Sequence, residues 1–302
     1  NLGSINLSKF ISNGQVSWKR LAKTVHDSVR FLDDVIEVNR YPLKKIEDLT
    51  RSNRKIGLGV MGFADMLIQL NIKYDSDEAI KFAEKLMGFV RKESRKASQK
   101  IADKRGSFKN FRNSALKKDF KRMRNAQLTT IAPTGSISII ANCSSGIEPL
   151  FGLSFVRNIL DGVQLRESNA AFERIAKEKG FFSKELMMKI AKTGSIRQMK
   201  EIPIEIRKVF VTSHDISPEW HIRLQATFQR YTDSAVSKTI NLPANASRAD
   251  VAKAYLLAWK LKCKGITVYR YGTKKDQVLV RKECLHADSE FGGDCVGSEC
   301  SF

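Results

Sequence analysis

Residues 133–138 (Pro-Thr-Gly-Ser-Ile-Ser) carry the residue types that could hold a phosphate group. A stretch of strand composition ends at Pro133, and a glycine and three hydroxyl residues follow before an apolar run. Backbone N–H groups freed at such a turn, together with Ser and Thr hydroxyls, suit an oxyanion without a lysine. An ordinary capped turn has the same pattern, so spacing alone leaves both interpretations open.

Two other segments place polar side chains among apolar ones. In residues 144–149, Glu148 lies between an isoleucine and a proline. A carboxylate in such surroundings is typical of a structural hydrogen-bond acceptor rather than of loose surface. Residues 238–243 (Lys-Thr-Ile-Asn-Leu-Pro) alternate in a similar way, which predicts a strand end near a site.

Gly57, Gly59 and Gly62 have the Gly-x-Gly-x-x-Gly spacing of a dinucleotide fingerprint. That fingerprint needs an apolar strand immediately before it, and residues 51–55 (Arg-Ser-Asn-Arg-Lys) do not predict one. We therefore expect no Rossmann site. We interpret the glycines as small residues that let a helix over residues 63–70 pack closely against a neighbour.

The histidines and the first two cysteines do not indicate a metal site. His214 and His221 are seven residues apart, and a capping or packing role is more common for such a pair than metal ligation. Cys143 and Cys263 lie in apolar surroundings, which favours packing roles.

The last cysteines lie in a Gly-rich C-terminal segment. Cys284, His286, Cys295 and Cys300 could in principle supply four zinc ligands, but their spacing is irregular. Two thiols on a polar tail favour disulfide exchange instead, and we assign that function to Cys295 and Cys300. We expect no metal.

Helices alternating with short strands favour an α/β fold. Apolar periodicity, caps and breakers set the boundaries. The predicted helices cover residues 17–42, 76–106, 164–200 with breaks near Gly180 and Gly194, 218–234 and 247–261, and the predicted strands cover residues 126–132 and 266–269.

Composition excludes several classes of protein. The 302 residues are 42% hydrophobic and 28% charged, an ordinary globular balance that excludes disorder and coiled coil. No apolar run reaches the roughly 18 to 20 residues that span a bilayer. Five cysteines are too few for a disulfide scaffold, so we expect a reducing, cytoplasmic compartment.

The net charge of +21 favours anionic partners. The Lys and Arg residues are spread along the chain rather than held in one block, which is more typical of solubility than of a nucleic-acid footprint. We therefore do not expect nucleic acid as a partner.

Six segments together resemble the large, catalytic subunit of ribonucleotide reductase. They occur in the family's order and span residues 1 to about 278. The segments are residues 1–7 (Asn-Leu-Gly-Ser-Ile-Asn-Leu), 56–65 (Ile-Gly-Leu-Gly-Val-Met-Gly-Phe-Ala-Asp), 132–136 (Ala-Pro-Thr-Gly-Ser), 144–149 (Ser-Ser-Gly-Ile-Glu-Pro), 238–243 and 265–270 (Gly-Ile-Thr-Val-Tyr-Arg).

The resemblance implies an α/β barrel of ten strands built from two parallel halves, with radical chemistry on a loop inside it. Residues 1–278 would be the C-terminal part of that barrel, and residues 279–302 a flexible tail. Cys295 and Cys300 would carry reducing equivalents from thioredoxin or glutaredoxin to a buried disulfide. The loop for the substrate phosphates would consist of Pro133, Thr134, Gly135, Ser136 and Ile137.

The position of Tyr269 and Arg270 bears on how the radical arises. Reductases that receive it from a separate small subunit have two adjacent tyrosines there, whereas an arginine cannot relay a radical hole. The sequence is similar to the adenosylcobalamin-dependent class, although Tyr271 and Thr273 depart from that class's usual Asp and Ser. Adenosylcobalamin is therefore the implied cofactor, and a small-subunit class is the alternative.

The chain opens at Asn1 with neither Met nor a signal-peptide pattern, which is typical of the continuation of a longer sequence. In the family the radical-bearing cysteine, the second redox cysteine and the effector site lie upstream. We expect the C-terminal portion of a ribonucleoside-diphosphate reductase, a homodimer that needs the missing N-terminal half and is inactive alone. The other alternative is a basic nucleotide-binding remnant without chemistry.

Overall fold

The computed structural model describes residues 1–158, 164–273 and 279–280. The helices are α1 (Trp18–Val38), α2 (Lys44–Asn53), α3 (Phe63–Gln69), α4 (Asp77–Arg105), α5 (Gly135–Ile140), α6 (Ala170–Glu178), α7 (Lys184–Thr193), α8 (Ile204–Val209), α9 (Pro218–Arg230) and α10 (Arg248–Lys260), with short 3₁₀ turns η1 (Leu7–Phe10), η2 (Lys109–Asn113) and η3 (Ala115–Lys118). The strands are β1 (Leu2–Asn6), β2 (Ile11–Ser12), β3 (Gln15–Val16), β4 (Gly57–Met61), β5 (Ser154–Asn158), β6 (Gln164–Ser168), β7 (Thr239–Leu242), β8 (Thr267–Arg270) and β9 (Leu279–Val280).

Local sequence accounts for the long helices. In α1 the apolar stripe that includes Leu21, Val25 and Val29 is buried, as the periodicity predicts. The Ser76 hydroxyl caps the first turn of α4, and the helix ends at Gly106, whose φ of 81° favours glycine. The predicted boundaries of both helices are confirmed to within a few residues.

Parallel pairing organises the strands. β1 runs parallel to β4 from the pair Leu2–Gly57 to the pair Asn6–Met61. The predicted strand at 126–132 is extended beside β4 through a parallel bridge from Leu58 to Thr129, and then bridges Ile131 to Val236. β7 and β8 form a further parallel pair. The described strands therefore form short, mostly parallel pairs covered by helices, and they do not close into a barrel.

The glycines of residues 57–62 have a different role from the one predicted. They form β4, which is buried along its whole length, instead of a surface for helix packing. A Cβ on Gly59 would lie 2.3 Å from the carbonyl oxygen of Thr130, so only glycine allows the strand to approach its neighbour this closely. Gly62 then starts α3 with a φ of 71°.

The helix predicted from residue 164 is wrong over its first residues. β6 pairs there antiparallel to β5, from Ser154–Ser168 to Asn158–Gln164, and such pairing with another segment can override the helical preference of a short stretch. The breaks predicted near Gly180 and Gly194 are confirmed, since α6 and α7 end just before them.

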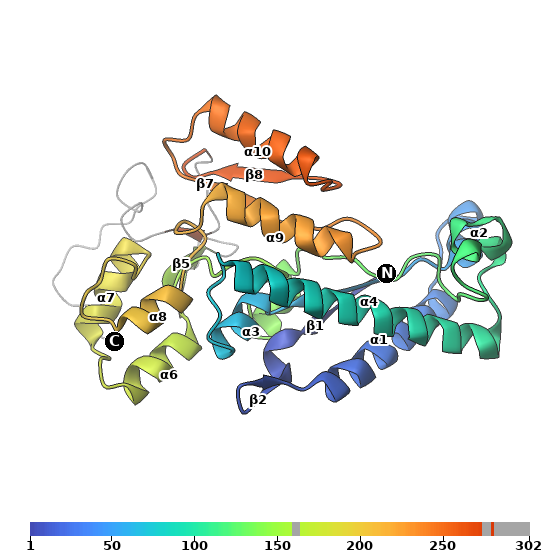
Figure 1. Cartoon of the computed structure of the whole chain (residues 1–302), viewed down its shortest axis with the longest axis horizontal. Coiled ribbons are helices and arrows are strands. Elements are labelled where there is room, and N and C mark those ends of the chain that lie inside the picture. The colour runs from blue at the N-terminus through green and yellow to red at the C-terminus, as the bar shows by residue number, and fades with distance from the viewer. Residues whose placement is uncertain (159–163, 274–278, 281–302) are drawn as a thin grey trace.

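The helices pack side by side over the strands. Figure 1 shows α4 between α1 and α9, with α10 beyond α9 beside β8. A large core joins β1, β4, α1, α4 and α9, and a smaller core around Ile240 and Leu242 joins β7 to α10. No helix among the described residues combines the length and apolarity needed to span a membrane.

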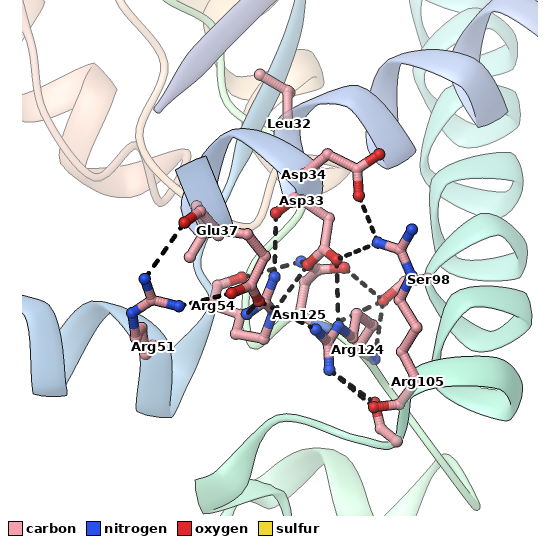
Figure 2. Close-up of polar contacts among 12 residues, drawn as sticks. Leu32, Asp33, Asp34, Glu37, Arg51, Arg54, Ser98, Arg105, Arg124 and Asn125 are labelled. Atoms are coloured by element: carbon pink, nitrogen blue, oxygen red, sulfur yellow. Dashed lines mark hydrogen bonds and ion pairs between the residues drawn. The ribbon is translucent and has the colours of Figure 1, made fainter. Parts of the chain in front are cut away.

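A buried ionic network lies where the strands begin (Figure 2). The Asp33 carboxylate on α1 is fully buried and accepts hydrogen bonds from Arg54 (2.9 Å), Arg124 (3.1 Å) and Asn125 (2.9 Å). Glu37, one helical turn further on, also accepts from Arg54. These contacts tie α1 to the residues immediately before β4 and before the 128–131 stretch.

Candidate functional site

The 133–137 loop leaves the carboxyl end of the 128–131 stretch and starts α5. Thr134 adopts a left-handed conformation, with φ of 57°, so the chain turns sharply into the helix. Gly135, Ser136 and Ile137 are exposed, and the first N–H groups of a helix have no partner within it. Open space surrounds the position of a Cβ on Gly135. These N–H groups are therefore placed to bind an oxyanion.

The hydroxyl groups of this loop divide into two kinds. The Thr134 side chain is buried, and its Oγ1 accepts a 2.7 Å hydrogen bond from the Gly146 N–H. The buried Ser138 hydroxyl contacts the Ser145 hydroxyl at 2.8 Å. Both therefore shape the loop from within. The Ser136 hydroxyl, by contrast, lies on an exposed residue and is available to a ligand.

Residues 141–146 connect the carboxyl ends of the parallel strands. The Asn6 side chain at the end of β1 donates to the Ala141 carbonyl (3.3 Å). The Gly62 N–H after β4 donates to the Ser144 carbonyl (2.7 Å), and Asp65 accepts from the Ser144 N–H (2.6 Å). The motifs at 1–7, 56–65, 132–136 and 144–149 therefore meet at one edge of the sheet.

Glu148 is the structural acceptor that the sequence predicts. Its carboxylate accepts from the Thr239 N–H (2.6 Å) and from the Lys238 ammonium. Lys238 is fully buried and also donates to His221 Nδ1 (2.8 Å) and to the Thr239 carbonyl (2.8 Å). All three ammonium donors are thereby satisfied. We call Glu148, Lys238 and His221 the lysine network.

The electrostatics of the lysine network are consistent with these contacts. Burial, followed by the charge of Lys238, lowers the pKa of His221 well below its usual value. The histidine is therefore neutral: Nε2 donates to the Ser213 carbonyl (3.2 Å), which leaves Nδ1 to accept from Lys238. Burial also lowers the pKa of Lys238, and the Glu148 carboxylate opposes that shift. The packing role predicted for His221 is confirmed.

The two cysteines among the described residues, Cys143 near this edge and Cys263 between α10 and β8, are not poised for reaction. Burial, with a contribution from Asp65, raises the pKa of Cys143 to about 11, and burial also raises the pKa of Cys263. Both thiols are half-buried, which agrees with packing roles. Cys295 and Cys300 lie outside the described residues. Residues 1–158, 164–273 and 279–280 contain no group of three His, Cys, Asp or Glu residues arranged as a metal site.

A family model described as "Ribonucleotide reductase, barrel domain" matches residues 1–122 and 115–269. The chain belongs to the ribonucleotide reductase barrel-domain family. The six motifs that suggested the family all lie within or next to the matched residues. Four of them, at residues 1–7, 56–65, 132–136 and 144–149, meet at one edge of the sheet.

Two reductases of this family illustrate the similarity. A vitamin B12-dependent ribonucleoside-diphosphate reductase from Thermoplasma acidophilum is 54% identical over 280 residues, which are 92% of this chain and 36% of the relative. One from Mycobacterium tuberculosis is 47% identical over 306 residues, covering all of this chain and 44% of the relative. The chain thus spans less than half the length of these relatives.

A solved structure shows the same arrangement of elements. The class Id ribonucleotide reductase alpha subunit of Actinobacillus ureae superposes with a TM-score of 0.75 at 27% identity, over 90% of this chain and 49% of that one. Sequence reasoning missed the lysine network. Its residues were singled out separately, and the local signals were a carboxylate between an isoleucine and a proline and a lysine immediately before an alternating strand.

Proposed function

We propose that this chain is the portion of an adenosylcobalamin-dependent ribonucleoside-diphosphate reductase that binds the substrate phosphates and helps to form the barrel wall. The observation that carries the proposal is the exposed first turn of α5, at the carboxyl edge of parallel strands. Ligands of parallel α/β folds bind at that edge. Ser136, with the N–H groups of Gly135, Ser136 and Ile137, would contact the phosphates, and Pro133 and Thr134 would shape the loop.

The choice of reductase class rests on similarity and on one residue. The two relatives at 54% and 47% identity are named as vitamin B12-dependent enzymes. Arg270 ends β8 where small-subunit classes have a tyrosine. The hollow at residues 107–121 is strongly basic, whereas the hollow between β1 and α1 is largely apolar and includes Asn6 at the carboxyl end of β1. We assign no cobalamin ligand within this chain.

The remaining parts of the proposal concern the tail and the partners. Cys295 and Cys300 would transfer two electrons and two protons to an active-site disulfide and become a disulfide themselves. Thioredoxin or glutaredoxin would then reduce that disulfide again. The complete enzyme would be a cytoplasmic homodimer whose ribonucleotide substrate lies between this chain and the N-terminal half. The thiyl radical would be held on that half, so this chain alone would not turn over.

A chimera tests the proposal. Residues 1–280 of this chain replace the corresponding stretch of the Thermoplasma acidophilum relative, which is 54% identical there. We expect the chimera to reduce CDP with a dithiol reductant only when adenosylcobalamin is added, and Ser136→Pro to abolish turnover. A folded chimera without turnover, or turnover that needs no adenosylcobalamin, would contradict the proposal. Turnover by the isolated chain would contradict its predicted inactivity.

A further inference from the structure

An open hollow of about 770 Å³ lies at the other end of the strands from the 133–137 loop, in the segment that follows α4. The Phe108 N–H donates to the Met123 carbonyl (3.1 Å) and Asn110 donates to Asn53 of α2 (3.1 Å), which fixes the segment in place. The lining residues are Ser107, Phe108, Lys109, Phe111, Arg112, Lys117, Lys118, Asp119, Phe120 and Lys121.

The charge of this hollow is almost entirely positive. Five cationic side chains line it against the single carboxylate of Asp119. All five are exposed, and within the described part of the chain none of them forms an ion pair or a side-chain hydrogen bond. The neighbouring Arg105 and Arg124 differ, because Asp34 and Asp33 neutralise them. The hollow therefore holds concentrated, uncompensated charge.

The surrounding sequence concentrates the basic character of the molecule. Contrary to the even spread expected above, residues 91–124 contain fourteen Lys and Arg but only three Asp and Glu, and so carry about half of the net positive charge of the whole chain. The floor of the hollow is firmly packed: Phe108 and Phe111 are buried edge-to-face at 5.6 Å, and the Arg95 guanidinium lies over the Phe120 ring at 5.3 Å. Firm packing holds the cations near one another despite their repulsion.

We propose that this hollow binds a polyphosphate chain of three or more phosphates, free or as part of a nucleoside triphosphate. Its volume lies within the roughly 300–1,000 Å³ typical of small-molecule sites. Five cations within residues 109–121 match the charge of one triphosphate group. A nucleic-acid backbone would need unpaired cations that continue beyond the hollow, whereas the flanking Arg105 and Arg124 are paired with Asp34 and Asp33. The site is separate from the substrate loop, which lies at the carboxyl edge.

Isothermal titration calorimetry of the 302-residue chain with sodium tripolyphosphate, at 50 and 200 mM NaCl, tests this. We expect Lys117→Glu with Lys118→Glu to weaken binding at least tenfold. Lys117→Arg with Lys118→Arg should retain it, because arginine keeps the charge. The matched control, Lys19→Glu with Lys260→Glu, makes the same change of charge on exposed residues of α1 and α10 and should leave binding within twofold.

Three results would overturn the proposal: equal weakening by the control pair, unchanged binding in the Lys117/Lys118 reversal, or tighter binding of a single-stranded oligonucleotide than of tripolyphosphate. Ser136→Pro should leave tripolyphosphate binding unchanged, which separates this site from the substrate loop. If ATP binds more tightly than tripolyphosphate, the ligand of the hollow is a nucleoside triphosphate. Equal affinities would show that the hollow recognises only the phosphate chain. Thermal unfolding followed by circular dichroism confirms that each variant is folded.

Discussion

Two buried ionic networks lie at opposite ends of the 128–131 stretch. At its amino end, Asp33 is enclosed by Arg54, Arg124 and Asn125. Beyond the carboxyl end of the 128–131 stretch, where β7 begins, Lys238 is enclosed equally well, but its partner Glu148 is about a quarter exposed and adjoins the segment that holds Thr134. The Asp33 network fixes α1 to the residues before β4 and before the 128–131 stretch. The lysine network instead fixes the segment that contacts the 133–137 loop, whose N–H groups have no partner within α5.

Buried ion pairs thus stabilise the fold at one end of the 128–131 stretch and position a ligand-binding loop at the other. In parallel α/β folds the carboxyl ends of strands carry ligand sites, and conserved packing at the amino ends serves stability. A buried ion pair contributes little net stability when complete, but breaking it is costly. Variants of the two networks should therefore separate loss of stability from loss of ligand binding.

The largest expected effect is on the Asp33 network. Asp33→Asn should lower the free energy of unfolding by about 3–5 kcal/mol, because it leaves the buried Arg54 and the partly buried Arg124 short of a counter-charge. Urea denaturation measures this loss. Asp34→Asn, on a half-exposed neighbour paired with Arg105, should cost less than about 1 kcal/mol. Equal losses in the two variants would contradict the structural role of Asp33.

The next largest expected loss of stability is in the lysine network, and it also affects the 133–137 loop. Lys238→Met should cost about 2–3 kcal/mol, less than Asp33→Asn, because water can reach the partly exposed Glu148 carboxylate. It should also speed hydrogen exchange at the Gly146 N–H, which Thr134 holds. Asp33→Asn should leave that exchange unchanged under native conditions. An unchanged Gly146 rate in Lys238→Met would remove the link between the lysine network and the loop.

The smallest expected effect is a pH dependence of the free energy of unfolding that comes from His221 in the lysine network. Because the folded-state pKa of His221 is depressed, the unfolded chain binds an extra proton as the pH falls through about 6.5. Stability should therefore decline from pH 7.5 to 5.5, by up to about 1.4 kcal/mol per pH unit from this group. His221→Gln keeps both hydrogen bonds and should remove that part of the slope. Chemical denaturation of the wild-type chain and of His221→Gln at several pH values measures both slopes. Identical slopes in the two proteins would contradict a contribution from His221.

Sequence reasoning predicted what is determined locally. The apolar stripes and caps of α1 and α4 lie within each segment, so their boundaries were predicted. β4 was missed because two of its five residues are glycines and all five are buried, so no polar/apolar alternation marks it as a strand. Its conformation depends on Thr130, about seventy residues further along, which a reading of residues 51–62 does not contain.

The same distinction holds for the candidate site. Pro133, Gly135 and Ser136 indicated an anion-binding turn because proline, glycine and hydroxyl residues act on their immediate backbone. The lysine network was not predicted, since Lys238 meets a histidine 17 positions away and a glutamate 90 positions away. Only folding brings those three together.

The most direct test of the account is to locate the phosphates of a ribonucleotide on the chain. Titration of the ¹⁵N-labelled 302-residue chain with CDP, followed by amide chemical shifts, should move the signals of Gly135, Ser136 and Ile137 first. Gly135→Val should abolish those shifts while leaving the fold intact. Absence of shifts at these three residues, or shifts confined to residues 107–121, would contradict the assignment of the 133–137 loop to the substrate.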